Sequence, residues 1–564
     1  MKVTTYIAKF LKDKGVDTVF ELQGGMITRI LDELNKQGGF SIVSMHHEQA
    51  AAFAADAYGR IKNKPGIALA TSGPGATNLI TGIGNCYFDS VPAIFITGQV
   101  NLNEQKGDKA TRQIGFQETD IVSIVRPITK AAYAVKEANQ IPLILEEAWS
   151  IASEGRSGPV LIDIPMNLQK DEITGSESRD LAGSDAISTN EIQLYLNELN
   201  DSLKISQKPL VLVGHGVRLA NATEQFIEFV EKYNLPVVCS LHGLDAIPFN
   251  HPNRIGFIGT YGNRWANYAM GTCDLLLVLG SRLDLRQTGS DTDSFMKGKQ
   301  IFHVDIDNAE LNNRFPGCNT LNEELTDFLN LANLSKNSEK DIKEWFSEIE
   351  QKRQQLTDTA ELKDIKGINP NSFIHLLSQC SKQAKAFITD VGNNQMWTAQ
   401  SIELTTGQRF LSSGGMGAMG YSLPAAIGAS FALGKDPVVC IAGDGGFQIN
   451  IQELQTIRRN NLPIKIVIIN NHCLGMIRQF QDAYFDSCYQ STVNGYSTPD
   501  FEKVAKAYEI DAATISTPED LQSGLTRLWE KPDQPFLLNV SLDIHTNVYP
   551  KMMFGSPITE MEPK

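Results

Sequence analysis

Short apolar runs alternate with segments of helical periodicity along most of the chain. The first 170 residues contain the apolar runs "VDTVF", "FSIVSM", "GIALAT" and "PVLIDIP", each next to a segment with the period of a helix. The alternation returns over about residues 195–335, with "PLVLVG" and "LLLVLG", and over about residues 368–545, with "PVVCIAGDGG" and "IKIVIINN". Strands separated by helices are typical of parallel sheets, so the sequence predicts an α/β fold.

Two polar stretches divide this alternation into three blocks. Residues 170–191 contain almost no large apolar side chain, and residues 334–367 are charged and helical in pattern. A chain of 564 residues also exceeds what one hydrophobic core usually organises. We therefore predict three doubly wound parallel-sheet domains, at residues 1–170, 192–335 and 366–545. The first and third blocks share a plan of glycine loop, helix and apolar strand.

Charge and composition argue against several classes of protein and of binding partner. The net charge is −15 and no basic run stands out, which argues against nucleic acid or an anionic membrane surface as a partner. No stretch reaches the roughly 20 apolar residues of a membrane span, and the amino-terminal segment lacks the pattern of a signal peptide. Eight scattered cysteines form no Cys-x-x-Cys pair, so we expect a cytoplasmic protein without a zinc site.

An acidic residue stands at the end of one very apolar strand. Asp444 follows "VVCIAG", where burial would not tolerate an unpaired charge, and the next strand ends in Asn470-Asn471. Mg²⁺ prefers oxygen ligands from one or two carboxylates, completed by phosphate oxygens. Asp444, the Asn471 amide oxygen and a carbonyl near Cys473 could supply three ligands. A tight turn would explain Gly-Asp-Gly alone, but the second strand ending in asparagines favours a magnesium-diphosphate site.

The segment around this site resembles a known motif. "GDGGFQINIQELQTIRRNNLPIKIVIINNHCLGMIRQF" is similar to the magnesium and diphosphate motif of thiamine diphosphate enzymes, in detail that of the acetolactate synthase catalytic-subunit family. The resemblance, which extends along nearly the whole chain, implies that Asp444, Asn471 and the Cys473 carbonyl hold Mg²⁺. It also implies that Met419 is the apolar wedge that bends thiamine diphosphate, and that the Gly417 carbonyl accepts the pyrimidine amine. The further cofactor contacts that it implies are Gly24, Gly25, Pro74, Asn78, Gly392, Asn393, Met416, Gly443, Gly445, Gly446, Gly475 and Met476.

A glutamate after an earlier strand completes the expected cofactor chemistry. Glu48 in "HEQAAAFAADAY" opens an alanine-rich helix, where the helix dipole alone would favour an acidic residue. The segment resembles the activating-glutamate segment of the same family. There a neutral carboxyl bonds the pyrimidine, and the cofactor's own amine then removes the thiazolium proton. In that family this glutamate and the metal-binding aspartate come from different subunits, so the resemblance implies a homodimer or homotetramer.

Four further positions align with the substrate pocket of the family: Phe116 and Gln117 in "GFQETD", Lys130 in "PITK", and Phe480 in "GMIRQF". An isolated lysine such as Lys130 is usually a solvated surface group. Phe480 stands where acetolactate synthases usually carry Trp, an exchange that enlarges the acceptor pocket and removes an N–H donor. Met166 stands where a lysine is common. The resemblance thus implies an intact cofactor site and an altered acceptor pocket.

The middle block resembles the flavin domain of the family. Arg156, Arg282 and Arg286 would be apt partners for the flavin pyrophosphate, although surface ion pairing would explain any one of them. Asp305 in "HVDID" also matches. The segment "GTYGNRWAN" carries Gly262 but reads Thr-Tyr-Gly where the family usually has Met-His-Gly. The resemblance implies bound FAD, which has no net redox task in acetolactate synthases.

The resemblance implies an enzyme that decarboxylates pyruvate and transfers the two-carbon hydroxyethyl unit to a second carbonyl compound. Acetolactate formation from a second pyruvate is the first expectation. The altered acceptor pocket favours, as an alternative, transfer to a keto-sugar nucleotide; simple 2-oxo acid decarboxylation or oxidation through the flavin comes third. A catalytically inert flavin- or nucleotide-binding subunit would not need Glu48, Asp444 and Asn471 together. The family also allows a small regulatory subunit as a partner.

Overall fold

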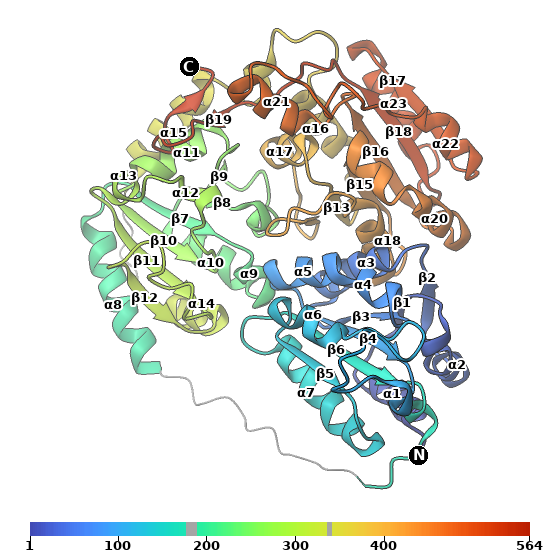
Figure 1. Ribbon diagram of the computed structural model, residues 1–564. Helices are drawn as coiled ribbons and strands as arrows, with labels where there is room; N and C mark the ends of the chain where they lie inside the picture. Colours follow the sequence, from blue (N-terminus) through green and yellow to red (C-terminus); the bar gives the residue numbers. More distant parts are fainter. Residues whose placement is uncertain (176–188, 336–340) are drawn as a thin grey trace.

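Three parallel sheets of six strands each organise the computed structural model, which describes residues 1–175, 189–335 and 341–564 (Figure 1). All strands of each of these sheets lie inside one of the three predicted domain ranges. The predicted α/β fold with three doubly wound sheets is therefore confirmed, while the domain limits themselves stay predictions. No helix in the described ranges is both long and apolar enough to cross a lipid bilayer.

The first sheet has the strand order β2-β1-β3-β4-β6-β5, with every neighbouring pair parallel. Alternate residues of its strands enter two separate hydrophobic clusters, one on each face. Its strands are β1 (Thr18–Leu22), β2 (Ser41–Ser44), β3 (Gly66–Ala70), β4 (Ala93–Gln99), β5 (Ala131–Ala134) and β6 (Pro159–Pro165), and its helices are α1 (Val3–Asp13), α2 (Thr28–Gln37), α3 (Glu48–Lys62), α4 (Pro74–Asn78), α5 (Ile80–Phe88), α6 (Ile121–Val125) and α7 (Ile141–Ser153).

The second sheet has the order β12-β11-β10-β7-β8-β9, the doubly wound order of dinucleotide-binding domains. Its strands are β7 (Pro209–Val213), β8 (Val237–Cys239), β9 (Arg254–Phe257), β10 (Leu275–Leu279), β11 (Gln300–Asp305) and β12 (Asn319–Asn322). Its helices are α8 (Thr189–Ile205), α9 (Gly216–Leu219), α10 (Thr223–Tyr233), α11 (Arg264–Thr272), α12 (Leu285–Thr288), α13 (Thr292–Met296), α14 (Leu325–Leu334) and α15 (Lys343–Gln355).

The third sheet, β14-β13-β15-β16-β18-β17, repeats the order of the first when the strands of each are counted from its own start. This agrees with the shared plan of the outer blocks in the sequence. Its strands are β13 (Ala386–Thr389), β14 (Arg409–Ser412), β15 (Val438–Gly443), β16 (Ile464–Asn470), β17 (Asp511–Ile515) and β18 (Phe536–Ser541). Its helices are α16 (Pro370–Cys380), α17 (Asn393–Ser401), α18 (Ser422–Ala432), α19 (Asp444–Ile449), α20 (Leu454–Asn460), α21 (Gly475–Tyr484), α22 (Phe501–Ala507) and α23 (Leu521–Trp529).

Helices α3 and α18 join the first and third domains (Figure 1). Both are rich in small residues, and a Cβ on Gly428 would lie 2.0 Å from the Ala54 carbonyl oxygen, so only glycine permits this approach. Beside the crossing, the buried Arg60 guanidinium lies 2.7 Å from Asp56 and 2.9 Å from Asp89. Close backbone packing therefore joins the two domains, while the buried ion pairs of Arg60 lie within the first domain beside the crossing.

The end of the chain packs against the central domain, close to α11 and α15 (Figure 1). The Met552 N–H donates to the Thr260 carbonyl at 2.7 Å, and the Arg264 guanidinium donates to the Met561 carbonyl at 3.3 Å. The sequence analysis made no prediction for this tail. It contains a two-stranded antiparallel sheet of β19 (Lys551–Met552) and β20 (Met561–Glu562).

His375 on α16 lies between two carboxylates. Its Nε2 is 2.8 Å from Asp358 and its Nδ1 is 2.8 Å from Glu403. Burial opposes the charged form, but the hydrogen bonds and charges of Asp358 and Glu403 outweigh it and raise the pKa of His375 above its ordinary value. A raised histidine pKa stabilises the folded protein below about pH 6.5, and this stabilisation is lost as the pH rises through the folded-state pKa.

We expect His375→Gln to lower the midpoint of thermal unfolding by several degrees at about pH 6, and we expect this loss to shrink toward about pH 9. Thermal unfolding of both proteins across this range, followed by circular dichroism, measures the difference. His251→Gln is the matched control, because in the described ranges His251 lies next to a single carboxylate, that of Glu231. A loss of the same size at every pH would contradict the assignment.

Candidate functional site

The carboxyl ends of β15 and β16 meet at one edge of the third sheet. The two strands pair in parallel, with Gly443 opposite Ile469. Asp444 therefore begins α19 directly after β15, and Asn471 follows β16 directly beside it. Both side chains are buried. The structure thus brings together the carboxylate and the amide that the sequence placed at two strand ends.

Three oxygen atoms converge at this edge. The Asn471 amide oxygen lies 3.2 Å from Asp444 Oδ1 and 2.9 Å from the Cys473 carbonyl oxygen. All three are acceptors, so these contacts are favourable either with the amide rotated, when its nitrogen donates to both, or with a cation between the oxygens. One carboxylate, one amide oxygen and one carbonyl form a donor set that suits Mg²⁺.

The environment of Asp444 also favours a cation. Burial raises the pKa of its carboxyl to about 7, although Tyr496 Oη donates to Oδ2 at 3.0 Å. A carboxylate in such a place is costly without a positive partner. Within the described ranges no group of three or more His, Cys, Asp or Glu side chains is arranged to hold a metal. The predicted site differs from such groups because amide and carbonyl oxygens supply most of its ligands.

Glycines surround these oxygens because side chains would not fit. A Cβ on Gly446 would lie 2.3 Å from Asp390 Oδ1, and one on Gly475 would lie 2.3 Å from Asn471 Nδ2. The Asn393 side chain reaches the same place, and its Oδ1 is buried with no hydrogen-bond partner among the described residues. The crowded backbone and the unpaired amide oxygen fit close contact with a ligand. The other predicted glycines here are Gly392, where φ is 139°, Gly443 and Gly445.

The loop before α18 is held by a buried carboxylate. Asp390 accepts from the Gly420 N–H at 2.9 Å and from both the N–H and the hydroxyl of Ser422. Gly417 lies in the left-handed region, with φ 64° and open space beside it. Met419 reaches to within 3.3 Å of the position that a Cβ on Gly445 would occupy. Two further predicted residues contact other parts of the chain. Met416 approaches Gly84 of α5, and Met476 packs against the core that the second and third domains share.

Glu48 belongs to the first domain, whereas Asp444 belongs to the third, and Glu48 lies at the carboxyl edge of the first sheet. It begins α3 shortly after β2, is buried, and accepts from Asn78 Nδ2 at 2.9 Å. A Cβ on Gly75 would lie 3.2 Å from Glu48 Oε1. The predicted residues Gly24 and Gly25 follow β1, and Pro74 and Asn78 are the first and last residues of α4 after β3, so all four lie near the same edge. No hydrogen bond or ion pair joins Glu48 to Asp444 in the described parts of this chain.

The predicted substrate residues are not gathered at one place within the single chain. Phe116 is 80% exposed. Gln117 has a φ of 65° and lies next to Gly73. Lys130 stands at the amino end of β5, where its ammonium donates to the Glu154 carbonyl at 2.7 Å, and so lies at the edge of the sheet away from Glu48. Phe480 is 48% exposed and contacts the rings of Tyr484 and Phe485.

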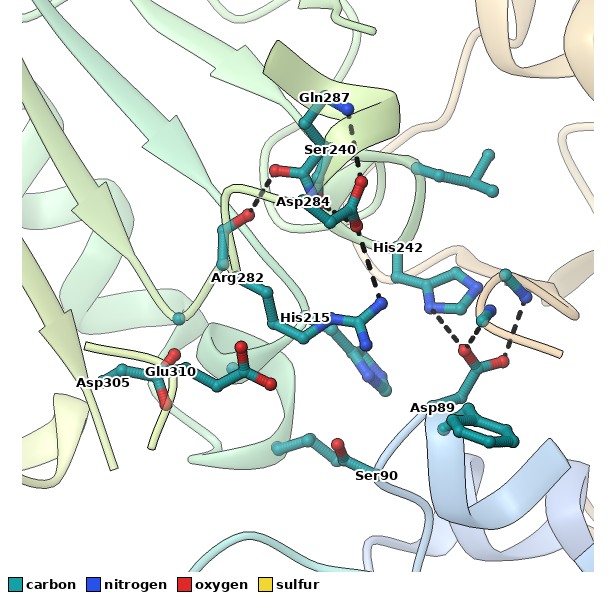
Figure 2. Close-up of a pocket in the computed structure, with 18 of the residues that line it drawn as sticks. Asp89, Ser90, His215, Ser240, His242, Arg282, Asp284, Gln287, Asp305 and Glu310 are labelled. Atoms are coloured by element: carbon teal, nitrogen blue, oxygen red, sulfur yellow. Dashed lines mark hydrogen bonds and ion pairs between the residues drawn. The ribbon is translucent and has the colours of Figure 1, made fainter. Parts of the chain in front are cut away.

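A cavity lies at the carboxyl ends of the central strands, and it gathers the predicted flavin residues (Figure 2). Arg156, Arg282, Arg286 and Asp305 all line it. Burial raises the pKa of Asp305 to about 6. Gly262 lies behind the cavity wall, where a Cβ would be 2.6 Å from the Gly259 nitrogen. Cationic side chains at the carboxyl edge of a doubly wound sheet suit a dinucleotide pyrophosphate.

Residues from the other two domains close this cavity. His242 of the central domain lies 3.9 Å from Asp89 of the first domain, and the Gly414 and Gly415 N–H groups of the third donate to that carboxylate (Figure 2). Burial opposes the ionisation of Asp89, but His242 and Arg60 lower the pKa of its carboxyl below the ordinary range. Burial also lowers the pKa of His242. The cavity therefore lies where all three domains meet.

Comparison with known proteins agrees with this architecture. The family profiles that match are the thiamine pyrophosphate enzyme N-terminal TPP binding domain at residues 1–124, the central domain at residues 196–330 and the C-terminal TPP binding domain at residues 390–540. The acetolactate synthase isozyme 2 large subunit of Escherichia coli (strain K12) is 36% identical over 570 residues, which cover 100% of this chain and 99% of the relative.

Other relatives match over similar lengths. The acetolactate synthase large subunit of Porphyra purpurea is 37% identical, with 97% of this chain and 93% of the relative covered. That of Lactococcus lactis subsp. lactis (strain IL1403) is 34% identical, with 98% and 95% covered. This chain belongs to the acetolactate synthase large-subunit family of thiamine pyrophosphate enzymes. The prediction of a thiamine diphosphate-dependent enzyme of the acetolactate synthase type is thus confirmed.

Sequence reasoning missed several residues that shape these sites in this member of the family. Asp390 follows β13 as Asp444 follows β15, so the same signal, an acidic residue directly after an apolar strand, could have identified it. Tyr496 had no such signal, because a loop brings it back to Asp444 from 52 positions away. His215 and His242 also line the central cavity without any prediction.

Proposed function

We propose that the chain catalyses acetolactate synthesis, in which one pyruvate loses carbon dioxide and its two-carbon unit joins a second pyruvate. Relatives that match over the full length are named acetolactate synthase large subunits. The neighbouring strand ends at Asp444 and Asn471 support the proposed activity most directly. Three converging acceptor oxygens beside crowded glycines suit a magnesium-bound diphosphate. Thiamine diphosphate, when bound, supplies a carbanion centre at its thiazolium ring.

The chain's own residues would bind and orient that cofactor. Asp444, Asn471 and the Cys473 carbonyl would hold Mg²⁺ and, through it, the diphosphate. The Gly417 carbonyl would accept a hydrogen bond from the pyrimidine amine, and Met419 would fill the space beneath the bent cofactor. Glu48, already buried and fixed by Asn78, would donate a proton to the pyrimidine ring from a site that excludes water.

We also propose FAD in the central cavity. Three arginines of the cavity would pair with the pyrophosphate, and Asp305 would accept from ribose hydroxyls. Arg156 is already paired with Asp307 at 2.8 Å and Glu310 at 2.6 Å, so its position is fixed before any ligand arrives. A yellow purified protein that releases one flavin per chain on denaturation would support the proposal, and a colourless one would contradict it.

The proposed assembly is a homodimer or homotetramer in which Glu48 of one chain faces Asp444 of another. Exposed apolar side chains near the metal site favour it, since Met416, Ile449, Ile477 and Phe480 are each at least two-fifths exposed. Sedimentation at several concentrations would measure the assembly. Titration with a separately purified small regulatory subunit would test the second proposed partner.

The activity itself is tested with the apo-protein and pyruvate. We expect carbon dioxide release and acetolactate only when thiamine diphosphate and Mg²⁺ are both present. Release without either addition, after thorough removal of both, would contradict the proposed chemistry. Carbon dioxide with acetaldehyde as the only product would leave the decarboxylation in place and remove the ligation step.

A second candidate differs only in the acceptor, which would be a keto-sugar nucleotide. Phe480 favours it, because the ring is half exposed on α21 and leaves more room than an indole. We expect Phe480→Trp to shift the ratio of acetolactate to keto-sugar product toward acetolactate by about tenfold, the scale of a small change in pocket size. Competition between pyruvate and a keto-sugar nucleotide measures the ratio. Phe485→Trp is the matched control, and an equal shift in both variants would argue against a special role for position 480.

A further inference from the structure

A second cavity lies in the central domain, away from the sites described above. It is formed by the loop that leads into β9, the start of α11 and the exposed side of α15. No residue that lines the flavin-type cavity lines this one. Its apolar walls are Phe249, Ile255, Trp265, Phe346 and Ile349. Its charged residues are His251, Arg254, Glu350 and Arg353.

Arg254 is the unusual residue of this cavity. Its Nε is buried without a hydrogen-bond partner, and within the described chain no carboxylate forms an ion pair with it. Its guanidinium stacks over the Phe249 ring, with Cζ 4.9 Å from the ring centroid. Burial lowers the pKa of Arg254, and the like charge of Arg353 adds to that effect. A guanidinium whose Nε is buried without a counter-charge is costly, so an anion would stabilise it.

Arg353 supplies a second cation from the opposite wall. Its Cζ lies 5.8 Å from the Trp265 ring centroid, so one face of this guanidinium is also next to an aromatic ring. Among the described residues it forms one ion pair, a loose one of 3.7 Å with Glu350, and its side chain is 45% exposed. The remaining basic side chain, His251, lies 3.2 Å from Glu231. Two guanidinium groups thus lie beside aromatic walls, and among the described residues neither has a carboxylate closer than the 3.7 Å of Glu350.

We infer that this cavity binds a small organic anion, a phosphate or carboxylate carried on a flat apolar body. The planar guanidinium fork matches both anionic groups, and the two arginines would hold the group between them. The apolar body would lie against Phe249, Phe346 and Trp265. The chain as a whole carries a charge of −15, so an anion would need such a local pair of cations. This inference does not depend on the proposed catalytic activity.

Calorimetric titration of the full-length protein with phenyl phosphate, benzoate and inorganic phosphate tests it. We expect at least one aromatic probe to bind with a Kd of about 1 mM or less, and inorganic phosphate to bind more weakly. The stronger of the two aromatic probes identifies the anionic group. Absence of binding by all three at about 10 mM would overturn the inference, as would equal affinity for inorganic phosphate and both aromatic probes.

Variants place the binding at this cavity. Arg353 is exposed, so we expect Arg353→Gln to fold normally. We expect this variant to bind the aromatic probe at least about tenfold more weakly, the scale of a charged hydrogen bond. Arg254→Met should weaken it further. Arg458→Gln is the matched control, since Arg458 is 44% exposed and, in the part of the chain that the structure describes, pairs with Glu509 alone. Unchanged binding in Arg353→Gln would show that the anion binds elsewhere and would overturn the assignment.

Discussion

Replacing Glu48 with glutamine is expected to lower kcat by about 10²- to 10⁴-fold, the usual scale for a positioned proton-transfer group. The amide keeps the shape of the side chain and can still contact Asn78, so thiamine diphosphate should bind with nearly unchanged affinity. What is lost is the proton that the carboxyl would share with the pyrimidine ring. Steady-state kinetics with pyruvate and a direct titration of the cofactor separate the two effects.

Glu33→Gln provides the control for this experiment. It makes the same chemical change on α2, where the carboxylate accepts from Thr5 Oγ1 at 2.9 Å and lies outside the proposed site. We expect it to leave kcat unchanged. Near-normal turnover in Glu48→Gln would remove Glu48 from the chemistry, whereas a loss of cofactor binding would make it a binding residue instead.

Asp444→Asn is expected to weaken the binding of Mg²⁺ and thiamine diphosphate together by at least about 100-fold, because even residues that only support metal ligands cost 10- to 100-fold when changed. The amide would remove the single formal negative charge among the three converging oxygens. Activity should fall in parallel at fixed cofactor concentration and should recover in part at high Mg²⁺. Calorimetric titration of the apo-protein with Mg²⁺ and cofactor gives the affinities.

Asp486→Asn is a suitable control for Asp444. Asp486 is exposed after α21, and its φ of 48° is one that asparagine also adopts readily. We expect unchanged cofactor affinity in this variant. If Asp444→Asn bound cofactor as tightly as the wild type, the metal site would have to be sought at other oxygens.

The part of the site that could be predicted from the sequence is the part that strand ends determine. Asp444 and Asn471 follow neighbouring parallel strands, so the periodic pattern alone places both at one edge of a sheet. Glu48 could be located in the same way, at the end of β2. Tyr496 could not, because its contact with Asp444 depends on the path of an irregular loop. Lys130 illustrates the same limit: it precedes a strand, lies at the opposite edge from Glu48, and stays a prediction as a substrate residue.

The fold shows a similar division. Alternating apolar and helical segments were enough to predict three parallel sheets, since each sheet is built from strands within one block of the sequence. Contacts between blocks were not predicted, because they join residues hundreds of positions apart. The chain end on the central domain and the meeting of Asp89 with His242 are examples, and both depend on how the domains pack.

The crossing of α3 and α18 limits where this protein can be altered. A Cβ on Gly428 of α18 would meet the backbone at Ala54 of α3, and a Cβ on Gly66 of β3, which also packs on α3, would lie 1.9 Å from the Ala55 carbonyl oxygen. Random libraries that touch these positions would mostly yield misfolded chains. On α21, Phe480 and Tyr484 are about half exposed within the single chain, so a change there meets no backbone of the same chain. Directed evolution of a new acceptor should therefore vary α21 and keep the helix crossing as it is.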